Sequence, residues 1–253
     1  MVDKIVTACV VTIGDEILSG RTKDANLSYI AKHLNEIGVQ VAEARVICDV
    51  EDVIVATIND VRAKYDYVFT TGGIGPTHDD ITADSVAKAF GVGIGPHPEA
   101  VAVLEKHYEE TGNEFTVARQ RMARIPEGGI LIDNPVSKAP GFQIGNVFVM
   151  AGVPMIMQVM LDSLTDRLEG GAKMLSRTLT ASIGEGTIAK PLAALQEKYK
   201  TVSLGSYPYF QDKSYGTSIV MRSIDSERLN AAAKEVKALM EDLGVEPVEG
   251  EAR

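Results

Sequence analysis

The stretch YDYVFTTGGIGPTHDD, residues 65–80, combines residue types that suit a phosphate and a metal ion. Three glycines fall within four positions, and two adjacent carboxylates, Asp79 and Asp80, follow four and five residues after the last glycine. Glycines let backbone N–H groups approach phosphate oxygens closely. Because carboxylates beside a phosphate repel it unless a divalent cation lies between them, the stretch predicts Mg²⁺ or a similar ion that bridges the two.

A structural explanation of the same stretch stays open, since a glycine-rich turn before an aspartate at a helix N-terminus is common. The pattern is not the dinucleotide fingerprint G-x-G-x-x-G, because His78 occupies the place of the third glycine. The chain also contains no G-x-x-x-x-G-K-[ST] phosphate loop. The glycines and acids alone therefore do not decide between a turn and a site.

Three further loops follow predicted strands and favour a site. TIGDEILSGR ends the first apolar run and adds Asp15 and Glu16, NPVSKAPGF contributes Lys138, and MAGVP contributes Gly152. In a parallel sheet such loops open at the same edge, where ligands bind. We take Asp79 and Asp80 as catalytic candidates. The metal-ligand candidates are Asp15, Glu16, Asp79 and Asp80. The candidates for binding the ligand and its phosphate are Gly14, Ser19, Thr71, Gly72, Gly73, Gly75, Lys138 and Gly152.

The elements that position these loops alternate between strand and helix patterns. Residues 4–14 form a nearly continuous apolar and β-branched run, which is typical of a strand buried on both faces. Helical spacing of apolar residues follows at 24–38, 51–65 and 81–91, with strands expected at 39–47 and 66–71. This order predicts an α/β fold with an open, mostly parallel sheet and helices on both faces.

Elements further along the chain are less regular. We expect helices at 97–112, 114–125 and 154–168, a strand at 128–133, and a hairpin that turns at Gly145-Asn146. Beyond residue 170 the order becomes strand, helix, strand, strand, helix, strand, which is typical of a small ferredoxin-like α+β module. We therefore expect one domain over 1–170 and a second over 171–253.

Composition limits the class of partner. The net charge of −10, with 35 acidic and 25 basic residues, argues against nucleic acid and anionic membranes as partners. No apolar stretch reaches the roughly 18 residues of a membrane span, and the N-terminal segment lacks a signal-peptide pattern. Cys9 and Cys48 lie in apolar runs, and we expect buried thiols of a cytoplasmic protein.

Four segments in this order, GDEILSGR, TTGGIGPTHDDIT, NPVSKAPGF and AGVP, resemble the MoaB/Mog-type molybdopterin-binding domain. The resemblance covers about residues 5–168. It is closest to the subgroup found at the N-terminus of CinA, the competence/damage-inducible protein, and of eukaryotic FAD synthases. SIGEGTIAKPL and VSLGSYPY resemble the small module that follows this domain in the CinA subgroup.

The resemblance implies that the glycine-rich loop contacts a pterin phosphate and that Asp80 is required for activity. It also implies hydrolysis of a dinucleotide pyrophosphate, of the ADP-ribose or FAD type, with Mg²⁺, Mn²⁺ or Co²⁺. The alternative is a protein that binds molybdopterin or a nucleotide without turnover and is linked to molybdenum cofactor metabolism. The subgroup pattern has Gly-Thr where Ser137-Lys138 stands and an acid where Ile156 stands, and both departures bear on catalysis. A homo-oligomer, dimer or trimer, is expected from resemblance alone.

Overall fold

The computed structural model describes residues 4–211 and 214–250 of the chain. The chain divides into two compact units, Met1–Gly171 and Ala172–Arg253. Each unit has its own hydrophobic core.

The first unit is built on a six-stranded, mostly parallel sheet with the order β2-β1-β3-β8-β7-β6. β1 (Val6–Ile13) lies between β2 (Val39–Ile47) and β3 (Tyr67–Thr71), and both pairings are parallel. β3 pairs in parallel with β8 (Val147–Met150). The strand order reverses at β1, because the chain places β2 on one side of it and β3 on the other.

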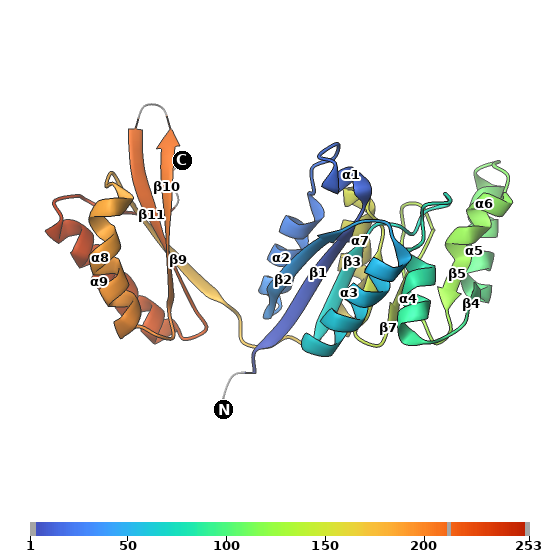
Figure 1. The fold of residues 1–253 in the computed structure, drawn as a ribbon, viewed down its shortest axis with the longest axis horizontal. Coiled ribbons are helices and arrows are strands. Elements are labelled where there is room, and N and C mark those ends of the chain that lie inside the picture. The colour runs from blue at the N-terminus through green and yellow to red at the C-terminus, as the bar shows by residue number, and fades with distance from the viewer. Residues whose placement is uncertain (1–3, 212–213, 251–253) are drawn as a thin grey trace. The chain divides into compact units, whose positions relative to one another are not determined.

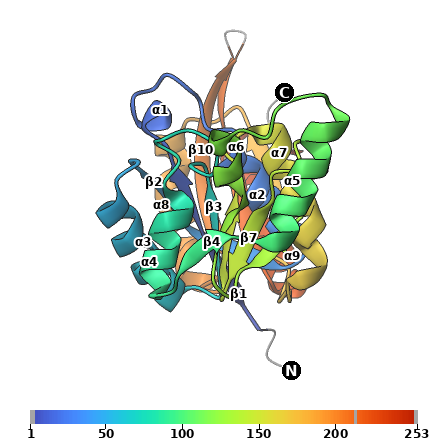
Figure 2. The same cartoon turned by 90° about the vertical axis from the view of Figure 1, so that its right-hand side faces the viewer.

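Helices cover both faces of this sheet, as Figures 1 and 2 show. Along β1, Val6, Ala8 and Val10 pack into one core, whereas Cys9 and Val11 pack into the other. This alternation explains why the β1 sequence is apolar at nearly every position. α2 and α7 cover the first face, and α3, α4 and α5 cover the second. The bounds are α1 Asp15–Leu18, α2 Asn26–Glu36, α3 Glu51–Lys64, α4 Thr82–Phe90, α5 Pro98–Glu110, α6 Val117–Gln120 and α7 Pro154–Leu164.

A hairpin completes the sheet at its antiparallel edge. β7 (Gly141–Ile144) turns into β8 through Gly145-Asn146, as the sequence predicts, and β6 (Ile130–Ile132) pairs with β7. The Asn146 side-chain amide donates to the carbonyl oxygens of Arg62 and Tyr65 at 3.0 and 2.9 Å. The turn is therefore anchored to the end of α3.

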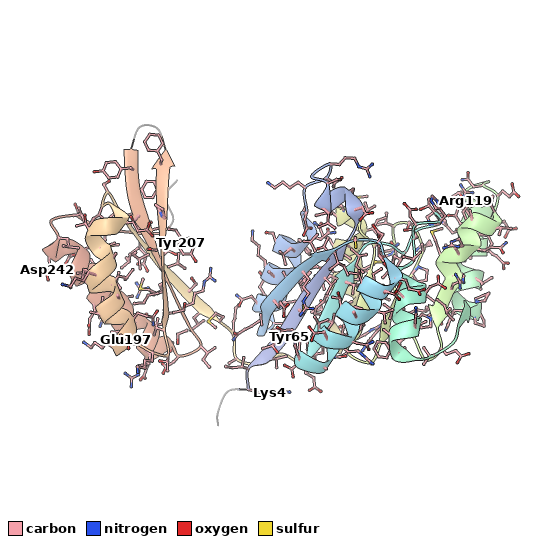
Figure 3. The ribbon with its side chains drawn as sticks, in the orientation of Figure 1. Lys4, Tyr65, Arg119, Glu197, Tyr207 and Asp242 are labelled. Carbon is pink, nitrogen blue, oxygen red and sulfur yellow. The ribbon has the colours of Figure 1, made fainter. Side chains whose placement is uncertain are left out.

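The prediction of a helix over 114–125 is wrong for the second half of that segment. α6 ends at Gln120, a 3₁₀ turn follows at Arg121–Ala123, and β5 (Arg124–Pro126) then pairs antiparallel with β4 (Ile94–Pro96). The residue before a proline is disfavoured in helical conformation, and Ile125 precedes Pro126. α6 is held against α5 by Arg119, labelled in Figure 3, whose guanidinium lies 4.4 Å from the Tyr108 ring centroid.

The second unit has the predicted ferredoxin-like order of elements. Its sheet has the order β10-β11-β9-β12, and all of its pairings are antiparallel. α8 and α9 supply one side of its core through residues such as Ile188 and Val236. The bounds are β9 Leu175–Ala181, α8 Glu185–Lys198, β10 Ser203–Gln211, β11 Ser214–Ser223, α9 Ser226–Asp242 and β12 Val248–Glu249.

The expected burial of both thiols needs correction. Of the two thiols, Cys9 is fully buried and Cys48 is only half-buried. Burial, and to a lesser degree the Glu43 carboxylate, raises the pKa of Cys9 to about 11, so this thiol is inert at neutral pH. Pro191 lies inside α8, which begins at Glu185.

Of the helices within residues 4–211 and 214–250, none combines the length and apolar character that crossing a bilayer requires.

Candidate functional site

Three parallel strands end side by side at one edge of the first sheet. Thr12 of β1 pairs with Thr71 of β3, and Thr71 pairs in turn with Met150 of β8. A glycine follows each of these three residues within two positions. The three glycines are Gly14, Gly72 and Gly152. This edge, next to the reversal of strand order at β1, is where open α/β sheets bind ligands.

A cavity of about 530 Å³ opens at this edge. Eight of the residues predicted from the sequence contribute to its wall. They are Gly14, Glu16, Gly72, Gly73, Gly75, Asp79, Asp80 and Gly152. A volume of this size suits a small organic ligand, since ligand pockets typically measure about 300–1,000 Å³.

Four predicted residues do not line the cavity. Asp15 and Ser19 are exposed, and the Ser19 hydroxyl donates back to the Glu16 carbonyl oxygen at 3.3 Å. Lys138 is half-buried in the loop before β7, with its amide donating to the Asn134 carbonyl at 3.0 Å. Thr71 is buried and faces a second, smaller cavity.

The glycine loop is shaped by contacts that exclude a side chain. Gly72 and Gly73 have φ of +105° and +68°, in the region that favours glycine. A Cβ on Gly72 would lie 2.1 Å from the Ile13 carbonyl oxygen, and one on Gly73 would lie 2.1 Å from Thr82 Oγ1. Thr82 fastens the loop to the start of α4, because its hydroxyl donates to Gly72 and its amide to Gly73, both at 3.0 Å.

The backbone N–H groups of this loop differ in their availability. The Gly72 N–H donates to the Met150 carbonyl at 3.1 Å and belongs to the sheet, so the expectation that this glycine offers its N–H to a phosphate is wrong. Within the described residues, the N–H groups of Gly73, Ile74 and Gly75 have no acceptor. All three residues line the cavity, so their N–H groups are available to an anion there.

Asp79 and Asp80 are organised by one threonine. Asp80 Oδ2 accepts from the Thr77 amide at 2.8 Å and lies 2.6 Å from Thr77 Oγ1. Asp79 Oδ1 also lies within hydrogen-bonding distance of the same hydroxyl. A hydroxyl has a single proton and can donate to only one of them. The hydrogen bond from Thr77, and then the backbone N–H of Asp79 itself, lower the pKa of Asp79, so this exposed carboxylate is negatively charged at neutral pH.

A further carboxylate at this edge, Asp49, is absent from the sequence prediction. It follows β2, lines the cavity, and accepts from the Asp15 amide at 2.8 Å. Burial raises the pKa of Asp49, and the charges of Asp15, Glu16 and Asp79 raise it further against the effect of that hydrogen bond. The charges of the first acidic turn and of Asp79 thus act on the same carboxylate, Asp49. The sequence signal that could have identified Asp49 is its position two residues after the predicted strand at 39–47.

The donor set fits a hydrated divalent ion better than a closed metal cage. Within residues 4–211 and 214–250, no three histidine, cysteine, aspartate or glutamate side chains are placed to hold one ion. Mg²⁺ usually keeps several waters and takes one or two carboxylates together with substrate phosphates. Asp79 and Asp80, beside free N–H groups for a phosphate, match that pattern.

The sequence prediction also missed two residues of the site, Arg121 and Asn134. Arg121 Nη2 donates to the Asp80 carbonyl oxygen at 3.3 Å, and its Nε is buried without a partner among the described residues. This guanidinium lies beside Gly73 and Gly75 and adds a positive charge to an otherwise acidic site. Asn134 Nδ2 donates to Ser137 Oγ at 2.6 Å, and both residues line the main cavity.

Lys138 and Ile156, where the sequence departs from the family pattern, have different consequences for the cavity. Lys138 has φ of +61°, a conformation in which glycine is unstrained, and its side chain is not part of the cavity wall. Ile156 lies in the wall and contributes apolar surface where the pattern has an acid.

Asp49→Asn should stabilise the folded chain at neutral pH. Because the folded state raises the pKa of Asp49 above its ordinary 3.8, ionisation of this group costs stability as the pH rises through that value. An asparagine removes this cost and can still accept from the Asp15 amide. In thermal unfolding followed by circular dichroism, the midpoint of the variant should exceed that of the wild type at pH 7, and the difference should shrink as the pH falls toward 3.8. An equal or lower midpoint at pH 7 would contradict this.

Comparison with known proteins identifies the family of the chain. Residues 9–170 match the family described as the probable molybdopterin binding domain, which is well over half of the chain. The chain belongs to the molybdopterin-binding domain family. The crystal structure of the protein CinA, of unknown function, from Thermoplasma acidophilum is 35% identical, covers 64% of this chain and 96% of that chain, and has a TM-score of 0.59.

Beyond the molybdopterin-binding domain, residues 173–249 match the middle domain of FAD synthase. A probable FAD synthase of Caenorhabditis briggsae is 30% identical over 92% of this chain and 49% of its own length. A CinA-like protein of Citrifermentans bemidjiense is 36% identical over 72% of this chain and 46% of its own length. The chain thus spans about half the length of these curated relatives.

Proposed function

We propose that the 530 Å³ cavity binds a phosphate-bearing nucleotide or pterin, and that the protein hydrolyses the pyrophosphate of a dinucleotide, of the ADP-ribose or FAD type, with a divalent cation. The observation that carries the proposal is the juxtaposition of free N–H groups and carboxylates in one wall. Gly73, Ile74 and Gly75 offer the donors, and Asp79 and Asp80 follow after three intervening residues.

Electrostatics supports the need for a cation. Glu16, Asp49, Asp79 and Asp80 all line the cavity, and the chain as a whole carries a charge of −10. A pyrophosphate brought beside these carboxylates is repelled. Arg121 and Arg124 lie near the loop, but Arg124 is already paired with Asp84, so the two arginines offset only part of the charge. A bound divalent ion, held by Asp79 and Asp80, would neutralise the phosphate oxygens and lower the pKa of a bound water.

The protein groups have separate roles in the proposed hydrolysis. Water adds to one phosphorus, the bridging P–O bond breaks, and two phosphomonoesters result. The N–H groups of the glycine loop bind phosphate oxygens, and Arg121 supplies positive charge beside them. Asp79, whose pKa is lowered, remains available as an anionic ligand. The Thr77 bonds fix the position of Asp80 within the cavity.

A second candidate is binding of molybdopterin or a nucleotide without turnover. Ile156 favours binding without turnover, because an apolar side chain stands in the cavity wall where the family pattern has an acid. The family description and the names of the relatives, FAD synthase and CinA-like protein, are compatible with either candidate.

Titration calorimetry with ADP-ribose and with FAD tests the binding part of the proposal. We expect heat of binding in the presence of Mg²⁺, Mn²⁺ or Co²⁺ and an affinity that falls at least tenfold when the ion is chelated. Equal affinity with and without the ion would contradict the placement of a cation between the carboxylates and the phosphate.

A further inference from the structure

A second, smaller cavity, here called the side pocket, adjoins the main cavity. It measures about 50 Å³ and lies between the ends of β1 and β3 and the loop that leads into α2. Ile13, Glu16 and Gly152 line both cavities, so a ligand in the main cavity can reach the side pocket without crossing the protein core.

Two buried oxygen atoms in the wall of the side pocket have no hydrogen-bond partner among the described residues: Asn26 Oδ1 and Thr71 Oγ1. Asn26 is 5% exposed and Thr71 is 1% exposed. The orientation of the Asn26 amide is set by its Nδ2, which donates to the Gly152 carbonyl at 2.8 Å. Asn26 Oδ1 is therefore left as an acceptor.

Of the other polar side chains that line the side pocket, Thr22 and Lys23 are exposed, whereas Asp24 and Thr12 are paired inside the protein. Asp24 Oδ1 accepts from the Asn26 amide at 2.8 Å, and Asp24 Oδ2 lies 3.2 Å from the Thr12 hydroxyl. Those contacts hold the loop in place and engage the Asn26 amide and the Thr12 hydroxyl as donors. Buried polar atoms in folded proteins nearly always have partners, so unpartnered acceptors at the end of a ligand cavity indicate a partner from outside the chain.

We propose that the side pocket receives an exocyclic amine on the heterocycle of the bound ligand, and that Thr71 and Asn26 determine which heterocycle is bound. This inference rests on the function proposed above. The volume decides how much of a ligand enters: a single water needs roughly 10–15 Å³ of this kind of space, so 50 Å³ admits the edge of a ring and not a whole base. An amine supplies two donors for the two free oxygens.

Two pairs of nucleotides test the inference, since the members of each pair differ by one amine. ADP is compared with purine riboside diphosphate, which lacks the 6-amine, and GDP with IDP, which lacks the 2-amine. Inorganic pyrophosphate serves as the probe without a base. All are titrated calorimetrically into the full chain with Mg²⁺. We expect the wild type to bind the amine-bearing member of one pair with roughly tenfold higher affinity, which is about the contribution of one hydrogen bond.

Thr71→Val should reduce that preference to less than twofold and leave the affinity for pyrophosphate unchanged. Thr70→Val is the matched control. Thr70 is the neighbouring residue of β3, is equally buried, and also has an unpartnered hydroxyl, but it lines neither cavity. Neither substitution should lower the unfolding midpoint, because each removes an unsatisfied polar atom. Thr71→Ser keeps the hydroxyl and should retain the preference.

Three outcomes overturn the inference in distinguishable ways. If pyrophosphate binds but the wild type prefers neither amine-bearing nucleotide, the phosphate site stands and the side pocket holds only water. If Thr71→Val keeps the wild-type preference, or Thr70→Val loses it, the preference arises elsewhere. If none of the five probes binds the wild type, the proposed function itself is wrong and the inference is lost with it.

Discussion

Asp80→Asn should lower metal-dependent hydrolysis of a pyrophosphate by roughly a hundredfold, because an ion held at the reacting phosphate typically contributes several kcal/mol. The asparagine side chain is the same size as that of aspartate, and its oxygen can still accept from the Thr77 amide and hydroxyl. The loop therefore keeps its shape while one negative charge is lost. Binding of the phosphate ligand should persist weakly. Turnover is measured by chromatography of the mononucleotide product.

Asp52→Asn is the control for the change of charge. Asp52 lies on α3, is 90% exposed, and contacts Lys88 on the surface. We expect wild-type turnover from this variant. Full turnover in Asp80→Asn, in a preparation whose wild type hydrolyses the same substrate, would remove Asp80 from the proposed catalytic group.

Gly73→Ala should abolish binding of every phosphate ligand, a stronger effect on binding than that of Asp80→Asn. A Cβ at this position would lie 2.1 Å from Thr82 Oγ1, and the backbone φ of +68° is strained for alanine. The loop must therefore move away from α4, and the N–H groups of residues 73–75 lose their arrangement. Calorimetry with inorganic pyrophosphate and ADP measures the loss.

Gly91→Ala separates this effect from backbone strain alone. Gly91 ends α4 with φ of +67°, nearly the value at Gly73, but a Cβ there would meet nothing within 4 Å. Alanine at Gly91 should cost about 1–2 kcal/mol of folding free energy and leave ligand affinity unchanged. If Gly73→Ala binds pyrophosphate as tightly as Gly91→Ala does, the glycine loop is a structural turn and not a binding element.

Much of the fold follows from local patterns in the sequence. The unbroken apolar run of β1 predicts burial on both faces, and the glycine and asparagine at 145 and 146 predict the β7–β8 turn. The segment after α5 could not be predicted in the same way. Its β5 strand exists because it pairs with β4, thirty residues earlier, and that pairing leaves no periodic signal in only three residues.

The candidate site was predictable where several residues act in one short stretch. The glycines and aspartates of residues 72–80 occur together in the sequence and lie together in the cavity wall. Asp49 and Arg121 were missed because each reaches the site alone from a distant element. Ser19 was expected in the site but lies outside it, because the short α1 turn directs its hydroxyl back to the chain. Thr71 was expected at the phosphate and instead faces the side pocket, since alternate residues of a strand face opposite sides.

The central claim is that the cavity at the carboxyl edge of the sheet hydrolyses a pyrophosphate with a divalent ion. Its most direct test is incubation of the wild-type chain with ADP-ribose and with FAD in the presence of Mg²⁺, Mn²⁺ or Co²⁺, followed by chromatography for AMP. We expect AMP to form with at least one substrate and ion, and we expect a chelator or Asp80→Asn to suppress its formation. Tight, ion-dependent binding of both substrates with no AMP formed under any of these conditions would contradict the claim and leave binding without turnover as the function.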